Sequence, residues 1–201
     1  MSVDPMRDAP FDDPAAWLRA RQWDQRVVPL VGELTDAVAT RVATELMALD
    51  ASGDDAVVLQ MDATGGSLDA AFMLMDTVDL LGVPVHARVV GRLAGVGTGV
   101  LAVTEHRTAS PHARFLLSLP GVEMHGNVAS LRAAADEHRR RADAYTRRLA
   151  EATGRALEQV EADVERGRWL DAEEALAYGL VDAIETRPAP GSSDRPRLGF
   201  R

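Results

Sequence analysis

The chain has 201 residues, a length typical of one globular domain. Hydrophobic residues make up 46% of it and charged residues 26%, so it has enough apolar material for a core. Its net charge of −9 argues against nucleic acid as a partner, and its lack of cysteine excludes disulfides, thiolate metal sites and a cysteine nucleophile.

The chain also contains no lysine. This excludes a lysine general base, a Schiff base and a Walker-type phosphate loop. The first 14 residues are acidic and lack the apolar stretch of a signal peptide, and the most apolar region, 80–103, is interrupted by histidine and arginine. We therefore expect a cytoplasmic protein that does not span a membrane.

Residues 1–25 are expected to form an extension with one short helix, because Asp13 is a typical N-cap and Pro14 a typical first helical residue. An apolar strand is predicted over 26–31, and Thr35 then caps a helix. The predicted inward face of that helix holds Val38, Val42, Leu46 and Met47.

The next segments continue the alternation of strand and helix. The apolar run 56–61 is typical of a buried parallel strand, Ser67 caps a helix, and 83–90 form another strand. Strands that alternate with helices predict a parallel sheet with helices on its faces.

The second half contains one long helix, predicted over Asn127–Ala152. Its pairs Asp136/Arg140 and Glu137/Arg141 have the four-residue spacing that stabilises an exposed helix. The other elements expected here are a helix opened by 91–99, a strand over 114–119, a helix over 157–164, a helix capped by Asp171 and ended by Gly179, and a strand over 180–184. The proline- and glycine-rich tail 187–201 is expected to be disordered.

Two glycine-rich turns, 62–67 and 91–99, follow predicted parallel strands. Such turns are typical of tight strand-to-helix connections. A nucleotide site is disfavoured, since neither turn has the G-x-G-x-x-G pattern. The remaining functional interpretation is an oxyanion hole built from backbone N–H groups of both turns.

These turns also carry a family resemblance. The segments GELTDAVA, TGGSLDAAFMLMDTVDLL, GRLAGVGTGVLAV and TGRALEQVEADVERGRWLDAEEALAYGLVD resemble the proteolytic subunit of Clp protease, a serine peptidase. The resemblance covers about 26–185. It implies an α/β, crotonase-like fold over 26–186, in which strand-helix units form a parallel-sheet head and a long "handle" helix occupies about 120–153.

The resemblance also places the three catalytic positions of the family. The nucleophilic serine corresponds to Gly95, the histidine to Ser118, two residues before Pro120, and the aspartate to Gly167, after Arg166. All three are substituted. Because nucleophile, base and orienting group act as a unit, we expect no catalytic residues and no hydrolysis by this chain alone.

A surrogate catalytic set remains an alternative. Its candidates are His125, the hydroxyls of Ser118, Thr98 and Ser67, and the carboxylates of Asp163 and Glu165. The structural interpretations are that Ser67 is a helix cap, Thr98 a helix-face residue and His125 a polar residue on an exposed strand. The other histidines, His86, His106, His112 and His138, lack metal-ligand spacing, so neither a metal nor a cofactor is expected.

The oxyanion hole is expected to survive the loss of the triad, because its donors are backbone groups. By resemblance these are the N–H groups of Gly66 and Val96, which could bind a peptide carbonyl or carboxylate.

The handle helix of the family interdigitates across two rings of seven subunits. Residues of this helix with helical-face spacing are Leu131, Ala135, His138, Ala142, Tyr145 and Leu149. The run Arg139–Arg141 is expected to be solvated, or to pair across rings.

The tail contains Leu198-Gly199-Phe200, an aliphatic-glycine-phenylalanine tripeptide of the kind with which Clp ATPases dock. These residues are therefore a candidate partner-docking motif.

The leading hypothesis is a non-catalytic Clp proteolytic-subunit-like protein, which self-associates in rings or joins an active Clp subunit, with a Clp ATPase as a further partner. The first alternative is a serine endopeptidase subunit that uses a surrogate nucleophile or acts only in a mixed complex. The second is a stand-alone peptide-binding or structural oligomer. A crotonase-like acyl-thioester enzyme is a more distant possibility.

Overall fold

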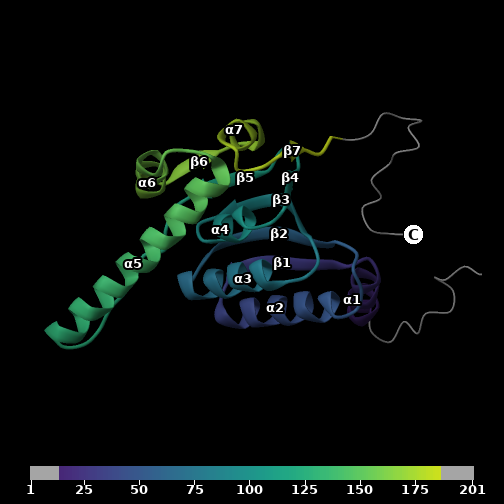
Figure 1. Ribbon diagram of the computed structural model, residues 1–201, viewed down its shortest axis with the longest axis horizontal. Helices are drawn as coiled ribbons and strands as arrows, with labels where there is room; N and C mark the ends of the chain where they lie inside the picture. Colours follow the sequence, from purple (N-terminus) through teal and green to yellow (C-terminus); the bar gives the residue numbers. More distant parts are fainter. Residues whose placement is uncertain (1–13, 187–201) are drawn as a thin grey trace, which may run out of the picture.

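The computed structural model describes residues 14–186. The docking motif Leu198-Gly199-Phe200 and the expected disordered tail lie outside the described residues. Within them, a seven-stranded sheet forms the middle of the molecule (Figure 1). The expected α/β class, with a mostly parallel sheet and a long helix, is confirmed.

Five strands run parallel across the sheet. In spatial order they are β1 (Val27–Leu34), β2 (Val57–Gly66), β3 (Val85–Ala94), β4 (His106–Ala109) and β7 (Ala183–Ile184). The far end of β3 also pairs in parallel with β5 (Arg114–Leu117), and β6 (Arg168–Leu170) pairs antiparallel with β5. The carboxyl end of β3 is therefore where the second half of the chain joins the first.

Helices surround this sheet. Figure 1 shows α2 (Asp36–Asp50) and α3 (Leu68–Leu80) side by side next to β1 and β2. The remaining helices are α1 (Pro14–Asp24), α4 (Gly97–Ala102), α5 (Val128–Thr153), α6 (Leu157–Arg166) and α7 (Ala172–Tyr178). The fully buried side chains between sheet and helices are mainly aliphatic, as the low aromatic content requires.

Local signals set the helix ends. Thr35 and Ser67 accept hydrogen bonds from the backbone N–H groups three residues later, and Asp171 forms a reciprocal capping box with Glu174. Asn127 caps α5 in the same way, and Gly154 ends it in the left-handed conformation, φ +66°.

Several sequence expectations about the elements were wrong. Strands β4 and β6 were not expected, because three or four residues are too few to show a periodicity. The strand predicted over 114–119 ends at Leu117, and the irregular segment that follows holds His125, which is therefore not on a strand. Met47 is 52% exposed, since it lies beside rather than on the buried face of α2.

The long helix α5 packs on the body only through its second half, where Tyr145 and Leu149 are buried. Its first half projects away from the sheet (Figure 1). The predicted pair Glu137/Arg141 is not formed: Glu137 accepts hydrogen bonds from Arg140, while Arg141 pairs with Asp69 of α3 at 2.9 Å and lies over the Phe72 ring. Tertiary proximity to α3 therefore determines the partner of Arg141.

Candidate functional site

The two glycine-rich turns meet at the carboxyl ends of β2 and β3, where Thr64 pairs with Ala94. A Cβ atom on Gly95 would lie 3.3 Å from the Gly65 Cα and 3.8 Å from the Ser118 Oγ. The position expected for a nucleophile, Gly95, is thus next to the position expected for a histidine, Ser118.

Gly167 comes to the same place through the β5–β6 ladder. Leu117 pairs with Arg168 in this antiparallel ladder, so Ser118, which follows Leu117, and Gly167, which precedes Arg168, are the next residues beyond its end. The three positions together supply one hydroxyl and no imidazole or carboxylate.

A cavity of about 240 Å³ opens at this meeting point. The glycine turns and the end of β5 form its wall, together with Arg92 and Trp169. Its lining is Thr64, Gly65, Gly66, Arg92, Ala94, Gly95, Val96, Leu116, Ser118, Leu119, Pro120 and Trp169. The structure thus brings Gly66, Gly95, Val96 and Ser118 around one cavity. The resemblance gave no indication of Arg92 or Trp169.

The two residues expected to supply oxyanion donors, Gly66 and Val96, both line this cavity. Gly66 has φ +126°, and a Cβ there would lie 2.3 Å from the Leu34 carbonyl oxygen, so this position requires glycine. Val96 lies in the turn between β3 and α4, and its N–H donates to no backbone carbonyl of the described residues. An N–H in this position is free to bind an acceptor.

Two buried hydroxyl groups, of Thr98 and Tyr145, contact the backbone carbonyl of the Gly95 turn. The Thr98 hydroxyl donates to the Gly95 carbonyl oxygen at 2.9 Å, and the Tyr145 hydroxyl lies 3.1 Å from that oxygen and 2.7 Å from Thr98 Oγ1. The Tyr145 ring fills the space left by Gly99, where a Cβ would lie 2.3 Å from the ring. Burial raises the pKa of Tyr145 to about 12, so the phenol stays neutral. The turn is therefore anchored to α5.

The candidates for a surrogate catalytic set do not come together. Ser118 makes no hydrogen bond with any described residue, and His125 is exposed and lines neither this cavity nor the larger one next to it. Ser67 caps α3, and its hydroxyl lies 3.3 Å from an Asp36 oxygen. Thr98 is fully buried in the hydrogen bonds just described.

The carboxylate nearest in sequence to Gly167 is already engaged. Asp163 is fully buried and accepts hydrogen bonds from Arg166, from Arg168 at 3.1 Å and from the Tyr178 hydroxyl at 3.0 Å. Burial by itself raises the pKa of Asp163, but these hydrogen bonds and the charge of Arg168 outweigh it and hold the pKa below its usual range. Asp163 thus supports the turn between α6 and β6.

A larger cavity, of about 750 Å³, adjoins the first one and shares Gly66 and Pro120 with it. It lies between the start of α2 and α3, the segment 120–124 and α5. Its charged lining residues are Glu33, Asp36, Asp69, Glu123, Glu137 and Arg141, and His138 also lines it. Sequence reasoning missed this cleft, because its walls come from segments far apart in the chain.

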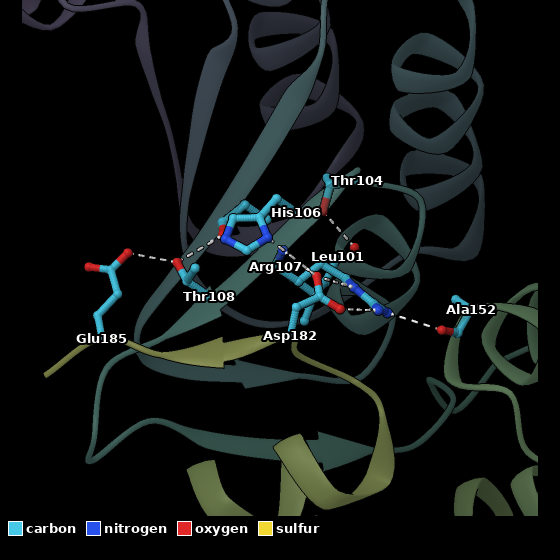
Figure 2. Close-up of polar contacts among 9 residues, drawn as sticks. Leu101, Thr104, His106, Arg107, Thr108, Ala152, Asp182 and Glu185 are labelled. Atoms are coloured by element: carbon cyan, nitrogen blue, oxygen red, sulfur yellow. Dashed lines mark hydrogen bonds and ion pairs between the residues drawn. The ribbon is translucent and has the colours of Figure 1, made fainter.

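A separate polar cluster ties β7 to β4 (Figure 2). Arg107 donates to both oxygens of Asp182, at 2.6 and 3.2 Å, and to the carbonyl of Ala152 at the end of α5 at 3.2 Å. Burial opposes ionisation of Asp182, but the contacts with Arg107 lower its pKa. His106 lies at the rim, 3.8 Å from Asp182. Among residues 14–186, no group of three or more metal-ligating side chains is close enough to hold a metal ion.

Comparison with known families decides the classification: the family model described as Clp protease matches residues 15–188. The chain belongs to the Clp protease family. It is 31% identical over 175 residues to an ATP-dependent Clp protease proteolytic subunit of Leuconostoc citreum, covering 85% of this chain and 88% of the relative. It is 34% identical over 172 residues to proteolytic subunit 2 of Mycolicibacterium paratuberculosis (84% and 86% covered) and to proteolytic subunit 1 of Mycobacterium bovis (83% and 85% covered).

The match to the Clp protease family begins at residue 15 and so includes α1, whereas the resemblance recognised from motifs begins near Arg26. None of the helices within the described range is both long and apolar enough to cross a membrane.

Proposed function

We propose that this Clp-family chain is a non-catalytic subunit that forms rings, alone or with an active Clp proteolytic subunit, and acts as a structural or regulatory partner in ATP-dependent proteolysis. The observation that carries the proposal is that Gly95 and Ser118 line one cavity, while Gly167 lies beyond the Leu117–Arg168 pair at the end of the ladder that leads to Ser118. This place offers no nucleophile at Gly95 and no base or orienting carboxylate beside it, so it cannot run the Ser-His-Asp mechanism.

The exposed half of α5 supports assembly. Residues 128–137 of this helix are almost all exposed, and Val128 at its start is 67% exposed. Most helical stability in proteins comes from tertiary packing, so a projecting helix of this length gains from a partner surface. In the Clp family the resemblance implies that this partner is the handle of an opposing ring.

The proposal has two direct tests. The native mass of the tagged chain, purified from its own cells, should equal a multiple of seven subunits, whether the ring holds this chain alone or also an active Clp subunit. A monomer or dimer would overturn ring formation, and a homomeric ring without other Clp components would favour the stand-alone oligomer. Deleting residues 196–201 should weaken docking of a Clp ATPase, and unchanged docking would remove the tail from the proposal.

A serine-reactive phosphonate should label active Clp subunits in the same sample but not this chain. The matched gain-of-function variant is Gly95→Ser, Ser118→His and Gly167→Asp together. Positive φ values of +62° at Gly95 and +70° at Gly167 strain these substitutions, so any labelling of the variant should be weak.

The alternative is a serine endopeptidase subunit with a surrogate nucleophile. It is favoured by one observation: Ser118 lines the same cavity as Gly66 and Val96, and its Oγ would lie 3.8 Å from a Cβ on Gly95. Labelling of the natural chain that disappears in Ser118→Ala would establish this alternative and refute the non-catalytic proposal.

A further inference from the structure

Two histidines lie directly opposite each other in neighbouring strands of the sheet. The ladder between β3 and β4 pairs His86 with His106. Paired residues of adjacent strands project their side chains from the same face of a sheet. The two imidazole rings accordingly lie side by side, with centroids 5.8 Å apart and ring planes at 79° to each other. Sequence spacing gave no sign of this pair, because only the ladder brings the two residues together.

Both rings are accessible and have no hydrogen-bond partner within the described range. The exposed fraction of the His106 side chain is 52%, and His86 is partly buried. Neither imidazole forms a hydrogen bond with another residue of 14–186. A hydrated ion can therefore reach the ring nitrogens, and among the described residues no donor or acceptor competes for them.

The separation of the rings fits a single metal ion between them. Imidazole binds a metal ion such as zinc at a nitrogen–metal distance of about 2.0–2.1 Å. Two imidazoles on one four-coordinate ion then have ring centroids about 5–6 Å apart. The observed 5.8 Å lies in this range. The β3–β4 ladder thus already holds the two rings at the distance that shared coordination requires.

The charges around the pair also favour a cation. The two nearby arginines are each bound to a carboxylate: Arg88 donates to Glu185 at 2.8 Å, and Arg107 donates to Asp182 at 2.6 Å. One oxygen of Asp182 lies 3.8 Å from the Nδ1 atom of His106 (Figure 2). A carboxylate beside one ring nitrogen favours the proton on that nitrogen and leaves the other nitrogen free to bind a metal.

We infer that His86 and His106 bind one divalent transition-metal ion through one nitrogen of each ring, with water completing the coordination. Imidazole ligands suit zinc, copper and nickel. Neither histidine lines the cavity beside Gly95 or the larger cleft next to it, so this site is separate from the candidate functional site. Because β4 also pairs with β7, the ion ties the central strand β3 to the edge of the sheet that holds the last strand.

Calorimetry with zinc tests the inference on the full chain, purified without a histidine tag. The site variants are His86→Asn and His106→Asn, and the matched control is His112→Asn, which replaces an exposed histidine outside the pair. We expect one zinc ion per natural chain, and binding at least about tenfold weaker in each site variant but unchanged in the control. Zinc should raise the Tm of the natural chain and of the control, and not that of the site variants.

A second measurement needs no variant and so does not depend on the folding of one. Electron paramagnetic resonance of the natural chain loaded with one equivalent of Cu²⁺ should show coupling to the nitrogens of two imidazoles. Absence of zinc binding, equal zinc binding by the natural chain and both site variants, or copper coupled to a single imidazole would overturn the inference. None of these results bears on the native mass or on phosphonate labelling, so the proposed function is tested separately.

Discussion

Replacing Tyr145 with phenylalanine tests whether buried hydrogen bonds anchor α5 to the Gly95 turn. The hydroxyls of Tyr145 and Thr98 and the Gly95 carbonyl oxygen make three contacts, of 2.7, 2.9 and 3.1 Å. Two hydroxyl protons can serve only two of these contacts at once. Phenylalanine keeps the ring and removes one proton, while the Thr98 hydroxyl and the Thr98 N–H, at 3.0 Å, still donate to Gly95.

The substitution therefore removes one buried hydrogen bond and leaves the Gly95 oxygen satisfied. We expect it to lower the free energy of unfolding by about 1 kcal/mol, which corresponds to a fall in Tm of about 2–4 °C for a domain of this size. Tyr145→Ala, which also empties the space beside Gly99, should cost about 3–5 kcal/mol.

Urea unfolding followed by circular dichroism measures both variants. The protein concentration must be the same throughout, because assembly stabilises the folded chain by mass action. A phenylalanine variant as stable as the natural chain would show that the hydroxyl contacts contribute nothing. One as unstable as the alanine variant would show that the hydroxyl, and not the ring, holds α5 in place.

Three further predictions concern stability. The two tyrosines of the chain, Tyr145 and Tyr178, both have pKa values of about 12, so absorbance near 295 nm should show no tyrosinate in the folded protein at pH 10. The chain unfolded in urea at the same pH should show it. Because the pKa values are higher in the folded chain than in the unfolded chain, the free energy of unfolding is unaffected by these tyrosines below pH 10 and falls between about pH 10 and 12. For the buried Tyr145 this fall amounts to roughly 3 kcal/mol. Asp163→Asn should lower the free energy of unfolding by about 2–4 kcal/mol, measured in urea at pH 7. Because the pKa of Asp163 is lowered in the folded chain, this carboxylate stabilises the natural chain above about pH 4, and the stabilisation is lost as the pH falls through the folded pKa. The variant should therefore lose less stability in acid than the natural chain does. Gly66→Ala should prevent accumulation of folded protein, because its Cβ would lie 2.3 Å from backbone, whereas Gly167→Ala, with nothing within 4 Å, should cost only about 1 kcal/mol in the same unfolding assay.

Local interactions made much of the fold predictable from sequence. Helix caps at Thr35, Ser67, Asn127 and Asp171 depend on residues three positions apart, so the sequence contains the whole interaction. The strand over 56–61 was recognisable from its almost continuous apolar run, since Val57, Leu59 and Met61 are buried and Val58 on the other face is partly covered. The short strands β4 and β6 were not, because pairing with distant strands defines them.

The same distinction applies to the candidate site. The motifs and glycine positions indicated the family, and residues 95, 118 and 167 carry the prediction that the side chains of a catalytic triad are absent. Only the tertiary structure placed Arg92 and Trp169 in the wall of the cavity beside Gly95, paired Arg141 with Asp69, and brought the Tyr145 hydroxyl to the Gly95 turn. The physical reason is that a missing side chain is a property of one position, whereas a cavity, an ion pair or a buried hydrogen bond depends on distances that chain folding alone sets.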